Sequence, residues 1–266
     1  TGSDYTYSIS TEEATTTTTT MSNSWSGSEA VRHVAVPFRP GRSGDEASVA
    51  LDLIADKTNL VALVAEEESH EIYTSSDGAT WSPATTQLTQ NLLVNDITSD
   101  EVIDGGLLAS IGGELIALIW DEDSGTITAF NSTNAGVAWT DESGFDIAST
   151  NGPQGVAVYP DIDGSNKLYV GTAEGLYIVD TSPSTWTYEL VMPMPHSTDN
   201  CRRMTIHEGS IWFAQGVDND SPAPIYKLTV QGNSRIIEPG FGLSYGDGVP
   251  SDMLGPVRWM VSSVDQ

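Results

Sequence analysis

Residues 48–266 consist of short apolar or alternating runs separated by polar and glycine-rich turns. Runs of this length, bounded by turn residues, are typical of β-strands. They recur in a fixed order along the chain. The first runs are Ser48–Ala55, Gly106–Ile111 and Gly155–Tyr159; the second are Asn59–Ala65, Glu114–Trp120 and Lys167–Ala173; the third are His70–Thr74, Thr126–Phe130 and Leu176–Val179. The pattern predicts an all-β chain built from repeated units.

A fourth unit follows the same order, and a fifth begins where the sequence stops. Their runs are Arg203–His207, Ser210–Ala214, Pro224–Val230, Ser234–Glu238 and Pro256–Val261. A repeat of roughly 45–55 residues with about four strands is typical of a β-propeller blade of antiparallel strands. The alternative is a β-sandwich, which also has a strand every eight to twelve residues or so.

The third run of the first unit leads into Ser-Ser-Asp-Gly-Ala-Thr-Trp, residues 75–81. Asp-Gly is a tight-turn dipeptide, and Asp and Thr side chains can bind backbone N–H groups of their own turn. The segment resembles the Asp-box of BNR-repeat β-propellers, with one residue fewer between Asp and Trp. The resemblance implies a hairpin between the third and fourth strands at the outer rim, with a structural role for Ser75, Asp77, Gly78, Thr80 and Trp81.

Two eroded copies of the box follow the third runs of the next two units. Residues 132–139 keep the full spacing in Ser132, Asn134, Gly136 and Trp139, while residues 180–186 keep only Thr-Trp, ending at Trp186. A sandwich does not predict a Trp at this place in successive units. Residues 168–177 are also similar to a strand pair of sortilin- and xyloglucanase-type propellers, which further favours the propeller.

The N-terminal part differs from the repeats. Residues 1–47 hold two strand-like runs, 4–10 and 31–37, and a Thr/Ser-rich arm between them. Propellers commonly hide their sheet edges by building one blade from both chain ends. We expect residues 1–47 to complete the last blade of a propeller formed by 48–266, giving about five blades. A six- or seven-bladed ring, of which this chain is a part, is the alternative.

Some Asp-box propellers are sialidases, and part of the residue set of that family has counterparts in this chain. Phe38-Arg39-Pro40 is similar to the Phe-Arg-Ile-Pro motif of that family, without the Ile. The resemblance implies substrate-carboxylate binding by Arg39, Arg203 and Arg258, with Asp45 as acid and Glu189 as partner of a Tyr nucleophile. The family's motif is incomplete here, and the sequence does not compel an enzyme.

The net charge of the chain indicates which kinds of molecule it can bind. The 37 acidic and 10 basic residues give a net charge of −27. Nucleic acid is an unlikely partner on this ground, because phosphate binding needs clustered Lys and Arg. Low Lys with high Asp and Thr resembles halophilic or marine proteins. No apolar run approaches the roughly 20 residues that span a bilayer.

Two Asp-rich turns, 121–125 and 161–164, look like the beginnings of calcium-binding loops. Neither has an acidic residue at the twelfth position that an EF-type calcium loop requires, so both are interpreted as hairpin turns. We expect no metal and no cofactor. The sequence therefore favours a non-enzymatic binding or assembly module, outside the cell or on a virion surface, whose partners are neighbouring protein subunits or a surface glycan. The alternative is a secreted glycoside hydrolase of sialidase-like type.

Overall fold

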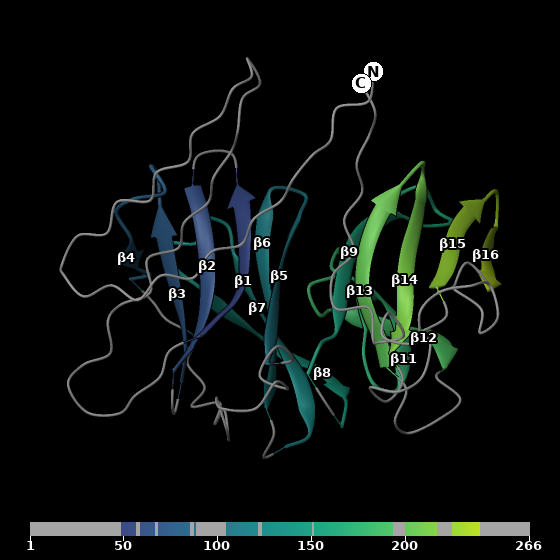
Figure 1. The fold of residues 1–266 in the computed structure, drawn as a ribbon, viewed down its shortest axis with the longest axis horizontal. Helices are drawn as coiled ribbons and strands as arrows, with labels where there is room; N and C mark the ends of the chain where they lie inside the picture. The colour runs from purple at the N-terminus through teal and green to yellow at the C-terminus, as the bar shows by residue number, and fades with distance from the viewer. Residues whose placement is uncertain are drawn as a thin grey trace, which may run out of the picture. The chain divides into compact units, whose positions relative to one another are not determined.

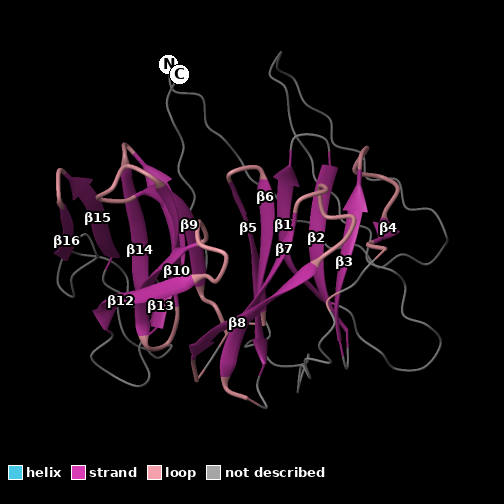
Figure 2. Cartoon of the chain, turned by 180° about the vertical axis from the view of Figure 1, so that it is seen from behind, coloured by secondary structure: helices cyan, strands magenta, loops and turns pink. Residues whose placement is uncertain are grey.

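The computed structural model describes residues 49–56, 59–66, 69–85, 88, 105–121, 124–150, 152–193, 200–216 and 225–239. All of them lie within the unit that spans residues 35–266. Among these residues there are strands, turns and loops and no helix (Figure 2). The all-β class predicted from the sequence is confirmed.

The strands form four antiparallel sheets of four strands each (Figure 1). The first sheet contains β1 (Val49–Asp56), β2 (Asn59–Glu66), β3 (Ser69–Ser75) and β4 (Ser82–Pro83). The second contains β5 (Gly106–Ile111), β6 (Glu114–Asp121), β7 (Thr126–Ser132) and β8 (Thr140–Ala148). The third contains β9 (Gly155–Pro160), β10 (Asn166–Gly171), β11 (Gly175–Asp180) and β12 (Thr187–Pro193). The fourth contains β13 (Asn200–His207), β14 (Ser210–Gly216), β15 (Ile225–Gln231) and β16 (Ser234–Pro239).

Within every sheet, the strands pair in the order in which they follow along the chain. Neighbouring sheets contact each other chiefly through their first strands: β1 with β5, β5 with β9, and β9 with β13. Sequential four-stranded sheets whose first strands face one another are the blades of a β-propeller. The first strands predicted from the sequence are confirmed in all four described blades. The predicted fifth strand, 257–261, and the arm of residues 1–47 lie outside the described residues.

Local sequence explains how the strands turn. Gly112 and Gly113 join β5 to β6 with φ of 62° and 93°, and Glu208 and Gly209 join β13 to β14 with φ of 47° and 68°. Two consecutive positive φ values define the two-residue turn that matches the twist of a hairpin. The pairing register shifts once in β1, between Ala50 and Asp52, and once in β13, between Arg202 and Met204.

One predicted strand is longer than the observed one. The apolar run 167–173 predicts a strand through Ala173, whereas β10 ends at Gly171. The hydroxyl of Thr172 accepts hydrogen bonds from the backbone N–H groups of Glu174 and Gly175, and this closes a turn where the sequence pattern continues the strand. Side-chain competition for backbone groups is the physical reason.

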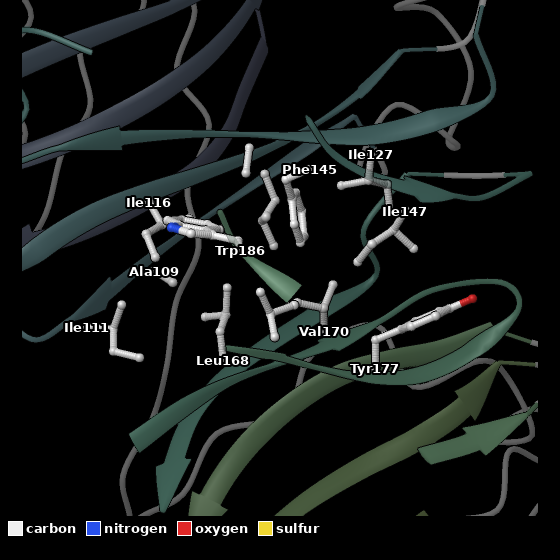
Figure 3. Packing of buried hydrophobic residues seen from close by; sticks show 13 residues of the cluster. Ala109, Ile111, Ile116, Ile127, Phe145, Ile147, Leu168, Val170, Tyr177 and Trp186 are labelled. Carbon is white, nitrogen blue, oxygen red and sulfur yellow. The ribbon is translucent and has the colours of Figure 1, made fainter. Parts of the chain in front are cut away.

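The core lies between the faces of successive sheets, in three clusters. The first joins sheets one and two, the second joins sheets two and three, and the third joins sheets three and four. Figure 3 shows the second cluster, in which Ile116 and Phe145 of sheet two lie near Leu168, Val170 and Trp186 of sheet three. Face-to-face packing of this kind holds adjacent blades together.

Each blade has two distinct ends. The hairpin end carries the turns between strands one and two and between strands three and four. The connection end carries the turn between strands two and three, and the segment that leads from the fourth strand to the next blade. Antiparallel order places these turns on opposite ends of every sheet.

Candidate functional site

The turn of residues 75–81, which resembles an Asp-box in sequence, lies at the hairpin end of sheet one and is held by its own side chains. The hydroxyl of Ser75 donates to Oδ1 of Asp77 at 3.0 Å and accepts from the N–H of Gly78 at 2.9 Å. The same Asp77 oxygen accepts from the N–H groups of Ala79 and Thr80 at 2.8 and 2.7 Å. These backbone hydrogen bonds, together with that from Ser75, lower the pKa of Asp77 to about 2. The carboxylate therefore organises the turn.

The second box reproduces this arrangement with an amide. Ser132 donates to Oδ1 of Asn134 at 2.8 Å and accepts from the N–H of Gly136 at 3.0 Å. Oδ1 of Asn134 also accepts from the N–H of Ala138 at 2.9 Å, and the indole N–H of Trp139 donates to the carbonyl of Gly136 at 3.0 Å. An Asn oxygen accepts as the Asp oxygen does, so the eroded copy keeps the turn without the charge.

The box tryptophans pack against the preceding sheet. Trp139 of sheet two belongs to the cluster shared with sheet one, and Trp186 of sheet three to the cluster shared with sheet two. Both are buried, at 4% and 7% exposure, whereas Trp81 is only partly buried. The described residues contain no sheet that precedes sheet one, and this explains why Trp81 lacks the cover that the other two have.

A buried ion pair joins sheets three and four at the hairpin end. Arg235, near the start of β16, donates from Nε and Nη2 to the two oxygens of Asp161, each at 2.7 Å. Tyr169 donates to Asp161 at 3.1 Å, and Nη1 of Arg235 lies 3.4 Å from Oε2 of Glu189. The hydrogen bond from Arg235 lowers the pKa of Asp161 despite its burial.

The two Asp-rich turns are hairpin or strand connections, as the sequence predicts. In the first, the N–H of Gly125 donates to the carbonyl of Asp121 at 2.8 Å. In the second, Asp163 accepts from the N–H and the hydroxyl of Ser165 and lies 3.3 Å from the ammonium of Lys167. Lys167 is buried and also lies 2.6 Å from Asp180. Burial opposes its charge, but the two carboxylates outweigh burial and raise its pKa.

The residues implied by the sialidase resemblance are placed as follows. Arg39, Asp45 and Arg258 lie outside the described residues, and Arg203 lies on β13, where only its backbone is described. Glu189 is exposed on β12, the outermost strand of its sheet, beside Arg235.

The connection end between sheets two and three holds a different kind of polar cluster. Thr150, just after β8, donates its N–H and its hydroxyl to Oε1 of Glu174 at 2.7 and 3.0 Å. Glu174 lies in the turn that Thr172 closes after β10. The segment between β8 and β9 is bound to the end of β10 by a hydrogen bond from the N–H of Gln154 to the carbonyl of Gly171 at 2.8 Å. The carboxylate is thus held by two short, rigid segments.

This cluster contains polar atoms that lack a partner among the described residues. They are Oε2 of Glu174 and the hydroxyl of Ser149, the residue before Thr150, and both atoms are buried. Sequence reasoning missed this cluster because the predicted strand 167–173 runs through Thr172, whose hydroxyl in fact closes a turn. The signal available was the Thr-x-Glu-Gly order, in which the Thr hydroxyl can bind the following N–H groups.

His70, at the start of β3, also lies at the connection end. Its side chain is buried at 2% exposure, and within the described part of the chain neither ring nitrogen has a hydrogen-bond partner. Burial lowers its pKa to about 4. Nε2 lies near Gly105, where a Cβ would approach to 3.3 Å. The imidazole is therefore neutral and unsatisfied at neutral pH.

Two further findings bear on the class of protein. In the described ranges, no group of three or more His, Cys, Asp or Glu side chains is arranged to hold a metal ion. Among the same residues, no helix is long and apolar enough to cross a membrane.

No protein-family model and no curated protein matches the chain. Among solved structures, it is similar to an alpha-L-arabinanase from Penicillium chrysogenum complexed with arabinobiose, with 13% identity, TM-score 0.49, and coverage of 74% of this chain and 67% of that one. It is also similar to an exo-beta-1,3-galactanase from Phanerochaete chrysosporium, with 10% identity, TM-score 0.43 and coverage of 72% and 48%. A Hadza microbial sialidase has 14% identity, TM-score 0.42 and coverage of 61% and 34%. The chain spans half or less of the last two. The fold assignment stands on the sheets themselves.

Proposed function

We propose that this chain is a non-enzymatic binding or assembly module, built on β-propeller blades, that works outside the cell or on the surface of a virion. Its partner is a surface glycan or a neighbouring protein subunit. It meets this partner through the connection end of the blades.

The supporting observation is the difference between the two ends. At the hairpin end, the polar side chains satisfy one another: Asp77 and Asn134 hold their turns, Arg235 holds Asp161, and Lys167 holds Asp163 and Asp180. At the connection end, Glu174, Ser149 and His70 retain buried polar atoms without partners within the described ranges. Only Trp81, among the residues with such atoms, lies at the hairpin end.

This difference favours binding at the connection end because an unsatisfied buried polar group costs about 1–3 kcal/mol. Native proteins retain few such groups, and each calls for an explanation such as a functional role or a bound partner. The described charged side chains of the hairpin end are engaged in holding turns and blades. At the connection end, three described residues keep buried polar atoms without a partner there, against one at the hairpin end.

The hypothesis is tested with a matched pair of bulky substitutions. Ser124→Trp adds bulk at an exposed turn of the connection end, and Ser184→Trp adds the same bulk at an exposed turn of the hairpin end. Binding to an array of cell-surface glycans and self-association in analytical ultracentrifugation are measured for both variants and the unaltered chain. We expect Ser124→Trp to reduce the interaction and Ser184→Trp to leave it unchanged.

The competing hypothesis of a sialidase-like hydrolase is tested in parallel. We expect no turnover of a fluorogenic sialoside by the unaltered chain. Turnover that Arg203→Ala abolishes would refute the proposed function. Loss of binding in Ser184→Trp but not in Ser124→Trp would place the interaction at the hairpin end and refute the proposed binding surface.

A further inference from the structure

The outermost strand of sheet three, β12, has an open edge. It pairs with β11 on one side, and no strand in the described part of the chain pairs with it on the other. Its first four residues, Thr187–Leu190, are all exposed. They pair with β11 in regular register, and the one register shift lies between Leu190 and Met192. Such an edge presents a row of unpaired N–H and C=O groups to an extended segment that approaches it.

The outermost strands of the other three described sheets have features that hinder such pairing. β4 has two residues, one of them Pro83. β8 contains three acidic side chains, a glycine at φ of 90° and a register shift. β16 has a charged side chain near each end, Arg235 and Glu238, and stops at Pro239. Short length, charge, proline and bulges protect edge strands, whereas β12 has one charged residue, Glu189, and its proline comes last.

The face of β12 toward sheet two is apolar. Side chains alternate along a strand, so Tyr188 and Leu190 share this face, and they are 46% and 42% exposed. The Tyr188 ring packs edge-to-face against Phe145 and Tyr177, at centroid distances of 5.7 and 5.9 Å. Its hydroxyl donates to the carbonyl of Asp146 at 2.8 Å. The exposed apolar surface is therefore held in place from both sides.

The opposite face of β12 is acidic. Glu189 lies there with its side chain 65% exposed, 3.4 Å from the guanidinium of Arg235. The same guanidinium also binds both oxygens of Asp161, so one cation serves two carboxylates and this face keeps a net negative charge. The other Lys and Arg residues whose side chains are described, Lys167 and Lys227, pair with carboxylates elsewhere. The net charge of −27 attracts a cationic partner over a distance.

From the open edge and its two faces, we propose that β12 is a docking site for an extended segment of a partner protein in which basic and apolar residues alternate. The segment adds a strand beside β12 through backbone hydrogen bonds. Its apolar side chains continue the face of Tyr188 and Leu190, and its Lys or Arg side chains lie on the face of Glu189. Cross-strand neighbours of these kinds are favourable. This docking site lies on the outer rim of the blade and is separate from the connection end of the proposed function.

Peptide binding is measured by fluorescence anisotropy at about 0.15 M NaCl, where long-range attraction is screened. The probe is a fluorescein-labelled peptide of the length of β12 in which Lys and Val alternate. Its control has the same residues with all Lys before all Val. We expect the alternating peptide to bind about tenfold more tightly, because only it places Lys on one face and Val on the other. Equal binding would show that net charge alone drives the interaction, and would overturn the inference.

N-methylation tests whether the peptide backbone makes the contact. Two further alternating peptides carry methyl groups on the backbone nitrogens of either all Lys or all Val residues. Alternate N–H groups of a strand point to opposite sides, so each peptide lacks the donors of one edge. We expect one of the two to lose about tenfold or more in affinity, and the other to bind as the parent peptide does. Equal affinities of the two would refute pairing along β12.

Two matched pairs of variants locate the peptide on β12. Leu190→Lys places on the edge a residue that natural edge strands use for protection, and Ile236→Lys does the same on β16, where Ile236 is 40% exposed. Glu189→Gln and Glu238→Gln each remove an exposed carboxylate that lies 3.4 or 3.5 Å from a cation. We expect Leu190→Lys to weaken binding about tenfold and Glu189→Gln about threefold, with no change in the two β16 variants.

Equal losses in the β16 variants would overturn the inference, because any part of the acidic surface would then serve. Dimerisation of the unaltered chain in analytical ultracentrifugation that Leu190→Lys abolishes would also overturn it, because the edge would then belong to a second copy. Ser124→Trp, at the connection end, should bind the peptide as the unaltered chain does. If that variant fails to reduce binding to glycans or subunits while the peptide results hold, the proposed function falls and this inference stands.

Discussion

Arg235 and Asp161 lie 74 positions apart in the sequence and meet in a two-point ion pair, with both N–O distances at 2.7 Å. Asp161 lies in the turn after β9 and Arg235 near the start of β16, so the pair ties sheet three to sheet four. Its geometry is the planar fork that makes arginine–carboxylate pairs specific. The carboxylate side chain is 6% exposed, which makes the pair sensitive to loss of either partner.

We predict that Arg235→Met lowers the free energy of unfolding by about 2–4 kcal/mol, because it leaves a buried carboxylate unpaired. Urea unfolding at pH 7 measures the change. Asp161→Asn in the same background should restore part of the loss, since the unpaired charge is then gone. A double variant whose loss equals the sum of the two single losses would show that the two residues act independently.

The pair also has a pH dependence of known sign. Because Arg235 lowers the pKa of Asp161 in the folded chain, its contribution is present above the ordinary pKa of an Asp. It is lost as the pH falls through the lowered value. Below that range, Arg235→Met and the unaltered chain should approach each other in stability.

The box tryptophans should differ in their contribution to stability. Trp139→Ala is expected to cost about 3–5 kcal/mol, because it empties a buried site between two sheets. Trp81→Ala should cost less, because Trp81 is only partly buried. Thermal melts of the two variants compare them directly. An equal loss would mean that another part of the protein covers Trp81.

Because burial lowers the pKa of His70, we predict that the free energy of unfolding falls in mild acid. Its pKa is about 4 in the folded chain and about 6.5 in an unfolded one. Between these values the unfolded chain binds more protons, so stability falls as the pH drops from 6.5 to 4, by up to about 3 kcal/mol. Urea unfolding at pH 7, 5.5 and 4.5 tests this.

His70→Leu should remove that part of the pH dependence, because Leu does not titrate. His207→Asn is the matched control, since His207 is partly exposed at the hairpin end. A pH profile that is the same in His70→Leu and the unaltered chain would show that other groups cause the loss.

Salt should stabilise the fold. A net charge of −27 gives mutual repulsion among surface carboxylates, and salt screens it. We expect the melting temperature to rise between low and molar NaCl, as measured by differential scanning calorimetry. A flat profile would remove the argument for a halophilic origin. A fall would indicate that ion pairs such as Lys167–Asp180 outweigh the repulsion.

The sequence by itself determined the strands and their order. Short apolar runs, two-residue turns such as Gly112-Gly113 and the repeated Trp after the third strand are local signals, and local backbone preferences act on them directly. The same signals located the turn of residues 75–81, because Ser75 and Asp77 bind N–H groups only a few residues away.

Only the tertiary structure decided which side chains meet across sheets. Arg235 with Asp161, and Thr150 with Glu174, come from separate blades, and no local pattern in a sequence with 37 acidic residues selects these partners. Burial is likewise a property of the assembled sheets. Trp139 and Trp81 look alike in sequence, yet among the described residues Trp139 lies buried between two sheets, whereas Trp81 is only partly buried. The unsatisfied atoms of Glu174, Ser149 and His70 emerge at this level, because a polar atom lacks a partner only once packing has excluded the water that would otherwise bind it.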